Sequence, residues 1–306
     1  MKFFGIIFLL LVNMVIAKPI RASEDIYSNI KYEAGKDYLV EQLGISEQKD
    51  HFGRDFFADP KDFKKILALV DPELATQGKW QSMGIQPWPN NPGNFLFIAC
   101  ENKANQDEQF FCSNPSQGKT IIALLKYNAK KEFTLAAKPW INHSVDKEDD
   151  SNDHNTAFLL RNGDSNEIIG RGRPTGFDFT PYRLSPKIPA FGLKYIVTHN
   201  QHPAKTIDEG VMLFAVINGH LRQVFNAPTY HLAYDAEIAD DGSIHLHSIS
   251  DEKIYQIIIS SNSFYKGMYY VDWINKRAGA LTANRYVWNG TEQYKAYISY
   301  GYDEKK

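Results

Sequence analysis

The chain has 306 residues and a formal net charge of −2, with 36 acidic side chains against 34 lysines and arginines. A charge this close to balance excludes the strong electrostatic attraction that non-specific binding to nucleic acid or to an anionic membrane requires. The length is enough for one large or two ordinary domains with a substantial hydrophobic core.

Residues 1–17 have the composition of a secretory signal peptide. Lys2 supplies a basic start, an almost unbroken apolar run follows to Ile16, and Ala17 is a small residue at the expected cleavage point. This run is too short to anchor the chain in a bilayer, and no later segment reaches the length of about 18 apolar residues that a membrane helix needs. We therefore expect an exported protein, secreted or periplasmic, that begins near Lys18 and has no membrane anchor.

Residues 18–94 are predicted to form a helical N-terminal region. Its clearest helix begins at Asp59-Pro60, an N-cap followed by a proline at the first helical position. Helical spacing then produces one apolar stripe, formed by Phe63, Ile66, Leu67 and Val70. Asp71-Pro72 ends the helix, because the residue before a proline resists the α conformation.

The N-terminal region is predicted to end in a loop at 78–94 that is rich in proline and tryptophan. Its prolines disfavour both a helix and a central strand. Two interpretations of Trp88 are open. The ring packs into the domain's own core, or a loop stiffened by proline presents it to a partner as a binding anchor. Trp80 and Trp88 are therefore the candidate binding residues.

Strand-like runs dominate from 95 to 306. The predicted fold class is mainly β (α+β), with antiparallel, hairpin-rich sheets in a sandwich-like arrangement beside the small helical region. The acidic stretch at 146–153 and the stretch at 170–189, rich in glycine and proline, are expected to be irregular, and either marks a candidate domain seam near 140–190. The expected strands are 95–99, 120–127, 133–137, 156–161, 193–198, 211–217, 221–225, 230–237, 244–249, 254–260, 268–274, 285–288 and 294–300.

Cys100 and Cys112 are the only cysteines, and each ends an apolar run. In an exported chain a pair of this kind most simply forms one structural disulfide across the polar stretch between the two runs. Such a bridge stabilises the folded chain by about 3 kcal/mol in the chain-entropy model. A redox-active pair would need a much closer spacing.

Two Asn-Gly pairs predict tight hairpin turns of type I′. Asn218-Gly219 joins the runs 211–217 and 220–225 and, by simple alternation, places five apolar side chains on one face: Met212, Phe214, Val216, Leu221 and Phe225. Asn289-Gly290 is expected to make the same turn between Trp288 and Thr291. The sequence also carries two N-glycosylation acceptor patterns, Asn142-His-Ser144 and Asn289-Gly-Thr291, which matter in a eukaryotic secretory pathway.

A third hairpin is predicted around Asp240-Asp241-Gly242. A loop of these three residues matches apolar side chains across the strands, setting Ile238 opposite Ile244 and Ala236 opposite Leu246. The opposite face then carries the pairs Glu237–His245 and Asp235–His247, and a longer pairing sets His231 against Asp251.

This polar sheet face has three interpretations. It is a solvated face in which histidines pair with acids, a divalent metal site built on His245-x-His247, or a contact surface that responds to pH. Because no third or fourth ligand is evident, we predict no metal site and no cofactor. No nucleophile elbow, zinc-binding helix motif, Walker loop or dinucleotide fingerprint is present in the sequence.

The expected function is therefore that of an exported binding protein with a protein partner, such as an inhibitor or immunity protein that blocks another secreted or envelope-acting protein. The alternative is a hydrolase of cell-wall material or polysaccharide that uses carboxylates from separate strands. A substrate-binding or structural component of the envelope is a third possibility. Whether the chain is an enzyme is left open, with the sequence favouring a binding protein.

Overall fold

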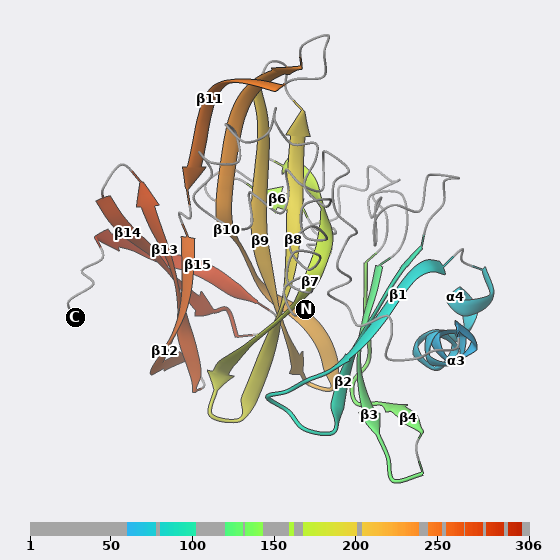
Figure 1. Cartoon of the computed structure of the whole chain (residues 1–306). Coiled ribbons are helices and arrows are strands. Elements are labelled where there is room, and N and C mark those ends of the chain that lie inside the picture. The colour runs from blue at the N-terminus through green and yellow to red at the C-terminus, as the bar shows by residue number, and fades with distance from the viewer. Residues whose placement is uncertain are drawn as a thin grey trace, which may run out of the picture. The chain divides into compact units, whose positions relative to one another are not determined.

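The computed structural model describes residues 60–77, 80–101, 120–130, 132–142, 159–161, 168–200, 204–238, 244–252, 255–265, 267–277, 280–290 and 293–301 (Figure 1). The predicted signal peptide lies outside these residues. The chain divides into two compact units. Among the described residues, the smaller unit holds 200, 204–206, 232–238 and 244–251, and the larger unit holds the others.

The predicted helix is confirmed as α3 (Pro60–Val70). Its apolar stripe is buried, as the pattern requires. The chain leaves the helix at Asp71, whose backbone N–H still bonds the carbonyl of Leu67 at 2.8 Å. A second short helix, α4 (Pro72–Gln77), follows, with Pro72 in the first helical position.

Sheet I is antiparallel and consists of β1 (Trp80–Pro87), β2 (Asn94–Glu101), β3 (Thr120–Tyr127), β4 (Phe133–Leu135) and β5 (Trp140–Asn142). The order is β1-β2-β3-β4, with β5 also paired to β3. The prediction of a loop over 78–94 is therefore wrong for β1. This strand pairs only with β2 among the described strands, and such an edge position tolerates Pro87 at its end.

Sheet II consists of β6 (Leu159–Arg161), β7 (Ile168–Ser185), β8 (Ile188–Asn200), β9 (Ala204–Ile217), β10 (His220–Ile238) and β11 (Ile244–Glu252), in the order β11-β10-β9-β8-β7-β6. The prediction that 170–189 is irregular is wrong, because β7 covers most of it. Three register shifts against β8 lie between Pro174 and Gly176, between Asp178 and Tyr182, and between Arg183 and Ser185. Bulges of this kind let glycine and proline enter a long strand.

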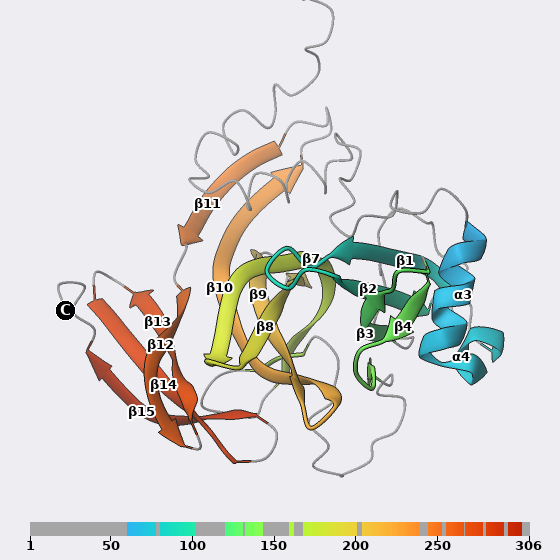
Figure 2. The same ribbon diagram turned by 90° about the horizontal axis from the view of Figure 1, so that it is seen from below.

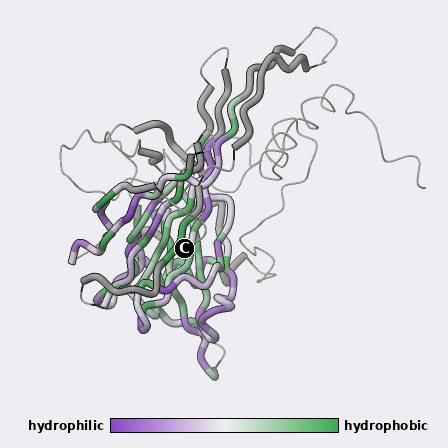
Figure 3. Tube along the Cα trace, turned by 90° about the vertical axis from the view of Figure 1, so that its left-hand side faces the viewer, coloured by the Kyte–Doolittle hydropathy of each residue, from purple (hydrophilic) through white to green (hydrophobic). Residues whose placement is uncertain are grey.

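Sheet III is an antiparallel meander of β12 (Tyr255–Tyr265), β13 (Met268–Arg277), β14 (Ala280–Trp288) and β15 (Tyr294–Gly301), in chain order. The described fold is thus mainly β with antiparallel sheets, which confirms the predicted class. Figure 3 shows hydrophobic residues along the middle of the strands and hydrophilic residues gathered at the turns.

Within the larger unit the sheets are stacked on shared hydrophobic cores (Figure 2). Core I/II joins one face of sheet I to one face of sheet II, with Leu96 and Phe214 among its members. Core II/III joins the other face of sheet II to sheet III, through residues such as Leu213 and Val271. A helix core packs α3 against the remaining face of sheet I.

Sheet II is therefore covered on both faces in the larger unit, and β9 shows the consequence in its sequence. Met212 and Phe214 belong to core I/II, whereas Val211, Leu213 and Ala215 belong to core II/III. A strand buried on both faces is a continuous apolar run rather than an alternating one.

The Asn218-Gly219 turn is confirmed, because both residues have positive φ, 51° and 78°, between the end of β9 and the start of β10. The prediction that Phe225 shares a face with Leu221 is wrong. Leu221 lies in core I/II, whereas Phe225 lies in core II/III together with its neighbour Val224. Two consecutive residues in one core show that strict alternation is interrupted between them.

The predicted two-residue turn at Asn289-Gly290 is also wrong. Trp288 pairs directly with Tyr294, so the connection runs from Asn289 to Gln293. The backbone N–H of Asn289 bonds the carbonyl of Gln293 at 3.0 Å, which closes this longer loop. Gly290 has a φ of 96°, the left-handed conformation that glycine adopts readily.

Candidate functional site

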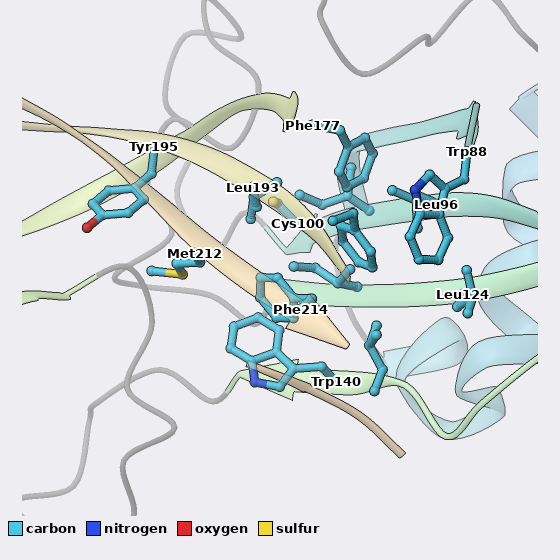
Figure 4. Close-up of a cluster of buried hydrophobic side chains, with 14 of the residues drawn as sticks. Trp88, Leu96, Cys100, Leu124, Trp140, Phe177, Leu193, Tyr195, Met212 and Phe214 are labelled. Atoms are coloured by element: carbon cyan, nitrogen blue, oxygen red, sulfur yellow. The ribbon is translucent and has the colours of Figure 1, made fainter. Parts of the chain in front are cut away.

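A polar cluster lies on neighbouring strands of sheet II at one end of core I/II. It consists of Tyr195 on β8, Asp208 on β9, and Asn226 and His231 on β10. The hydroxyl of Tyr195 donates a hydrogen bond of 2.7 Å to Oδ1 of Asn226. Nδ1 of His231 lies 2.7 Å from Oδ1 of Asp208. Figure 4 shows Tyr195 at the edge of the buried side chains, with its hydroxyl directed away from them.

The strand order explains how Tyr195 reaches Asn226. The two residues lie on β8 and β10, so the ring must cross the intervening strand β9. It crosses at Gly210, where an added Cβ would lie 2.2 Å from the ring carbon Cζ and from the hydroxyl oxygen. Only a residue without a side chain permits this approach.

Burial controls the chemistry of Tyr195. Its side chain is fully buried, which raises the pKa of the hydroxyl, and the negative charge of Asp208 adds to the increase. The hydroxyl therefore remains protonated through the physiological range and acts as a hydrogen-bond donor. It is not a nucleophile or a base near neutral pH.

The Asp208–His231 pair is more accessible than Tyr195. The side chain of His231 is 30% exposed and that of Asp208 is 13% exposed. A carboxylate that holds Nδ1 fixes the orientation of an imidazole ring, which is the role of the acid in hydrolytic triads. The Asp208–His231 pair therefore has the elements of acid–base chemistry.

An aromatic surface lies on sheet I and is made by Phe95, Tyr127 and Phe133. Tyr127 and Phe133 are paired across β3 and β4, with ring centroids 4.8 Å apart, and Phe95 lies 5.9 and 5.3 Å from them. Phe95 and Phe133 pack against the helix core, whereas Tyr127 is 42% exposed. The aromatic surface is therefore the part of the helix core that reaches solvent.

The turn beside the aromatic surface is closed by its own side chain. Oδ1 of Asn128 accepts hydrogen bonds from the backbone N–H groups of Lys130, at 2.9 Å, and of Glu132, at 3.0 Å. The backbone N–H of Asn128 also bonds the carbonyl of Glu132. An asparagine that satisfies its own turn in this way holds the β3–β4 hairpin in one conformation.

The predicted binding residue Trp88 is buried. Its side chain is 3% exposed and meets Phe191 edge to face, with centroids 5.3 Å apart. Figure 4 shows Trp88 within the cluster of buried side chains. The structure thus supports the interpretation in which Trp88 packs into the core, and its ring is not presented to a partner. Its indole N–H is buried without a hydrogen-bond partner among the described residues, as is that of Trp140. The side chain of Trp80 is outside the described set.

The predicted polar sheet face is described only in part. Asp235 and Glu237 lie on β10, and His245 and His247 lie on β11, which is hydrogen-bonded to β10. Their side chains and the register of the two strands lie outside the described residues, so the predicted pairs remain predictions. The same holds for the disulfide, because Cys112 is not described. Cys100 is buried on β2.

No spacing in the sequence groups Asp208, Asn226 and Tyr195 together. His231 was expected opposite Asp251, whose side chain is not described, and the described contact of its Nδ1 is with Asp208. The only local signal is the alternation Asp208-x-Gly210-x-Met212, which places these residues on one face of a strand. That pattern does not reveal which residues on β8 and β10 lie beside them.

Within the described part of the chain, no group of three or more histidine, cysteine or acidic side chains has an arrangement that could hold a metal ion. Neither α3 nor α4 has the length and apolarity that a membrane-spanning helix requires. Comparisons with models of protein families, with curated proteins and with solved structures found no match.

Proposed function

We propose that this protein is an exported, non-enzymatic binding protein, such as an inhibitor or immunity protein that blocks another secreted or envelope-acting protein. The observation that carries the proposal is the aromatic surface, in which Tyr127 is 42% exposed beside two further rings. An exposed tyrosine within an aromatic cluster is typical of the few residues that dominate the affinity of a protein interface.

The fixed β3–β4 turn supports this proposal. Because Asn128 closes the turn, the hairpin that carries Tyr127 and Phe133 loses little conformational freedom when a partner binds. A preorganised surface loses less free energy to ordering on association than a flexible one.

The ring of Tyr127 indicates the character of the partner, because the charges beside it are mixed. Lys130 and Glu132 are both exposed in the turn that follows Tyr127, and Lys126 lies on the opposite face of β3 by strand alternation. We therefore expect a partner with an apolar pocket for Tyr127.

Capture on the immobilised mature protein, from the medium or envelope fraction of its source, tests the proposal. We expect one stoichiometric partner, and Tyr127→Ala should weaken its affinity at least about tenfold, which is about 1.4 kcal/mol. Tyr297→Ala is the matched control, because Tyr297 is 60% exposed on a different sheet. A partner that binds Tyr127→Ala as tightly as the unchanged protein would contradict the role of the aromatic surface.

A hydrolase of cell-wall material or polysaccharide is the second candidate, and the Asp208–His231 pair supports it. Purified protein would then hydrolyse peptidoglycan, glycan or ester substrates, and Asp208→Asn would abolish the turnover. Turnover that survives Asp208→Asn and His231→Ala would exclude this pair as its source. Turnover that both variants abolish would replace the binding proposal.

A further inference from the structure

The loop between β14 and β15 presents an asparagine in the acceptor pattern Asn289-Gly290-Thr291. The base of this loop is fixed, because Trp288 and Tyr294 are both buried and paired, with ring centroids 5.5 Å apart. Asn289 follows directly and is exposed. It therefore stands at a rigid strand end and faces solvent.

The hydrogen bond that Asn289 accepts across the loop does not involve its side-chain nitrogen. Its Oδ1 accepts a hydrogen bond of 3.2 Å from the backbone N–H of Gln293. N-glycosylation replaces a hydrogen on Nδ2 and leaves the carbonyl oxygen unchanged. The bond that closes the loop is thus retained in the modified chain.

We propose that Asn289 is an N-glycosylation site, used when the chain is exported through the endoplasmic reticulum. The donor is an oligosaccharide linked to a lipid diphosphate. Nδ2 of Asn289 forms a bond to C1 of the first sugar, the C1–O bond to the diphosphate breaks, and Nδ2 loses one proton. The lipid diphosphate is the leaving group, and no electrons are transferred to or from an oxidant.

The second acceptor pattern has a different setting. Asn142 is the last residue of β5 and is in register with Thr120, a fully buried residue of β3. Asn142 thus belongs to the ladder of sheet I, whereas Asn289 lies in a connecting loop. The two asparagines form a natural pair of test and control positions.

The strand that follows Asn289 supplies a reason for a glycan at this place. Residues 295–299 of β15 are all exposed, with Tyr297 at 60% and Ile298 at 52%. β15 is also the last strand of sheet III and pairs only with β14 among the described strands. Exposed apolar edges promote association between chains, and a hydrophilic glycan at the start of this strand screens the edge.

The test uses the full chain, with its own leader, produced in insect or mammalian cells. The secreted protein is analysed by intact mass and by peptide mapping after treatment with peptide N-glycosidase. We expect the treatment to remove an oligosaccharide and to convert Asn289 to aspartate. Asn289→Gln and Thr291→Ala should both abolish the modification at this loop, and Asn142→Gln should leave it in place.

Thr291→Ala keeps the test decisive if Asn289→Gln fails to fold, because it leaves the Asn289 side chain intact. An unmodified Asn289 peptide in the secreted protein, or a modification that persists in Thr291→Ala, overturns the proposal. The screening role is measured separately by sedimentation. Thr291→Ala should self-associate more than the glycosylated protein, and adding Ile298→Lys should reverse this. Equal self-association of the two forms overturns the screening role.

Discussion

Gly210 and Tyr195 form a pair in which the size of one residue sets the position of the other. The Tyr195 ring occupies the space where a Cβ of residue 210 would lie. We expect Gly210→Ala to lower the free energy of unfolding by about 1–3 kcal/mol, because the ring or the strand must shift. Urea unfolding measures this loss.

A double-mutant cycle provides the control for this first prediction. If the overlap with the ring is the cause, Gly210→Ala should cost much less in a Tyr195→Ala background than in the unchanged protein. Equal losses in both backgrounds would indicate that the glycine acts through its backbone instead.

Two buried tyrosines lead to a prediction about alkaline pH. Burial raises the pKa of Tyr195 and of Tyr294 above the ordinary value near 10. The unfolded chain ionises first, so the stabilisation is complete below about pH 10 and is lost as the pH rises toward the folded pKa. Each tyrosine should lower the free energy of unfolding by about 1.4 kcal/mol per pH unit in that range.

Urea unfolding between pH 8 and pH 11 checks this expectation. Tyr195→Phe removes one ionisable group. In this variant the free energy of unfolding should fall less steeply with pH above pH 10, and its dependence on pH below pH 9 should be unchanged. A slope that does not change in this variant would show that other groups dominate the alkaline transition.

At the scale of elements, α3 offers a matched pair of leucines. Leu67 is 2% exposed in the helix core, whereas Leu69 is 39% exposed on the same helix. We expect Leu67→Ala to cost about 2–5 kcal/mol, because it removes a buried side chain and leaves a cavity. Leu69→Ala should change the stability by less than about 0.5 kcal/mol.

Thermal or urea unfolding of the two variants makes this comparison. Because both substitutions replace leucine by alanine in one helix, helix propensity cancels between them. Similar losses in the two variants would mean that α3 does not pack through Leu67 in solution.

The elements that were predicted correctly have strong local signals. The helix at 60–70 combines a proline start, an apolar stripe and a proline stop, and β3 contains the unbroken apolar run 121–125. The predictions are wrong where pairing with a neighbouring strand outweighs the local conformational preference of the residues. β1 is held by its pairing with β2, and β7 accommodates its prolines at bulges that depend on β8.

The candidate sites were less predictable than the elements, for the same reason. Tyr195 and Asn226 are brought together by strand order and by the glycine between them, and no spacing along the chain shows this. Trp88 illustrates the opposite error. Its proline-rich surroundings leave its exposure open in the sequence, and its burial follows from packing into core I/II beside Phe191.

At the scale of the whole molecule, the cysteine pair provides a prediction about the redox state of the chain. Cys100 is buried beside the Thr120 hydroxyl, 3.9 Å from its sulfur. We expect Cys100 and Cys112 to be bonded, so thiol titration of the denatured, unreduced protein should find almost no free thiol. Reduction should lower the free energy of unfolding by about 2–5 kcal/mol. Two reactive thiols before reduction would contradict the disulfide.

The burial of sheet II on both faces also determines what happens before the fold is complete. The run 211–217 in β9 has no charge and no proline, and its alternate residues need sheet I on one side and sheet III on the other. Those sheets lie before and after it along the chain, so β9 emerges during synthesis before one of its coverings exists. A newly made chain is therefore vulnerable to aggregation at this run until its last strands arrive. We therefore expect the yield of folded protein to be limited by the late arrival of sheet III, which covers β9, and not by the stability of the finished core.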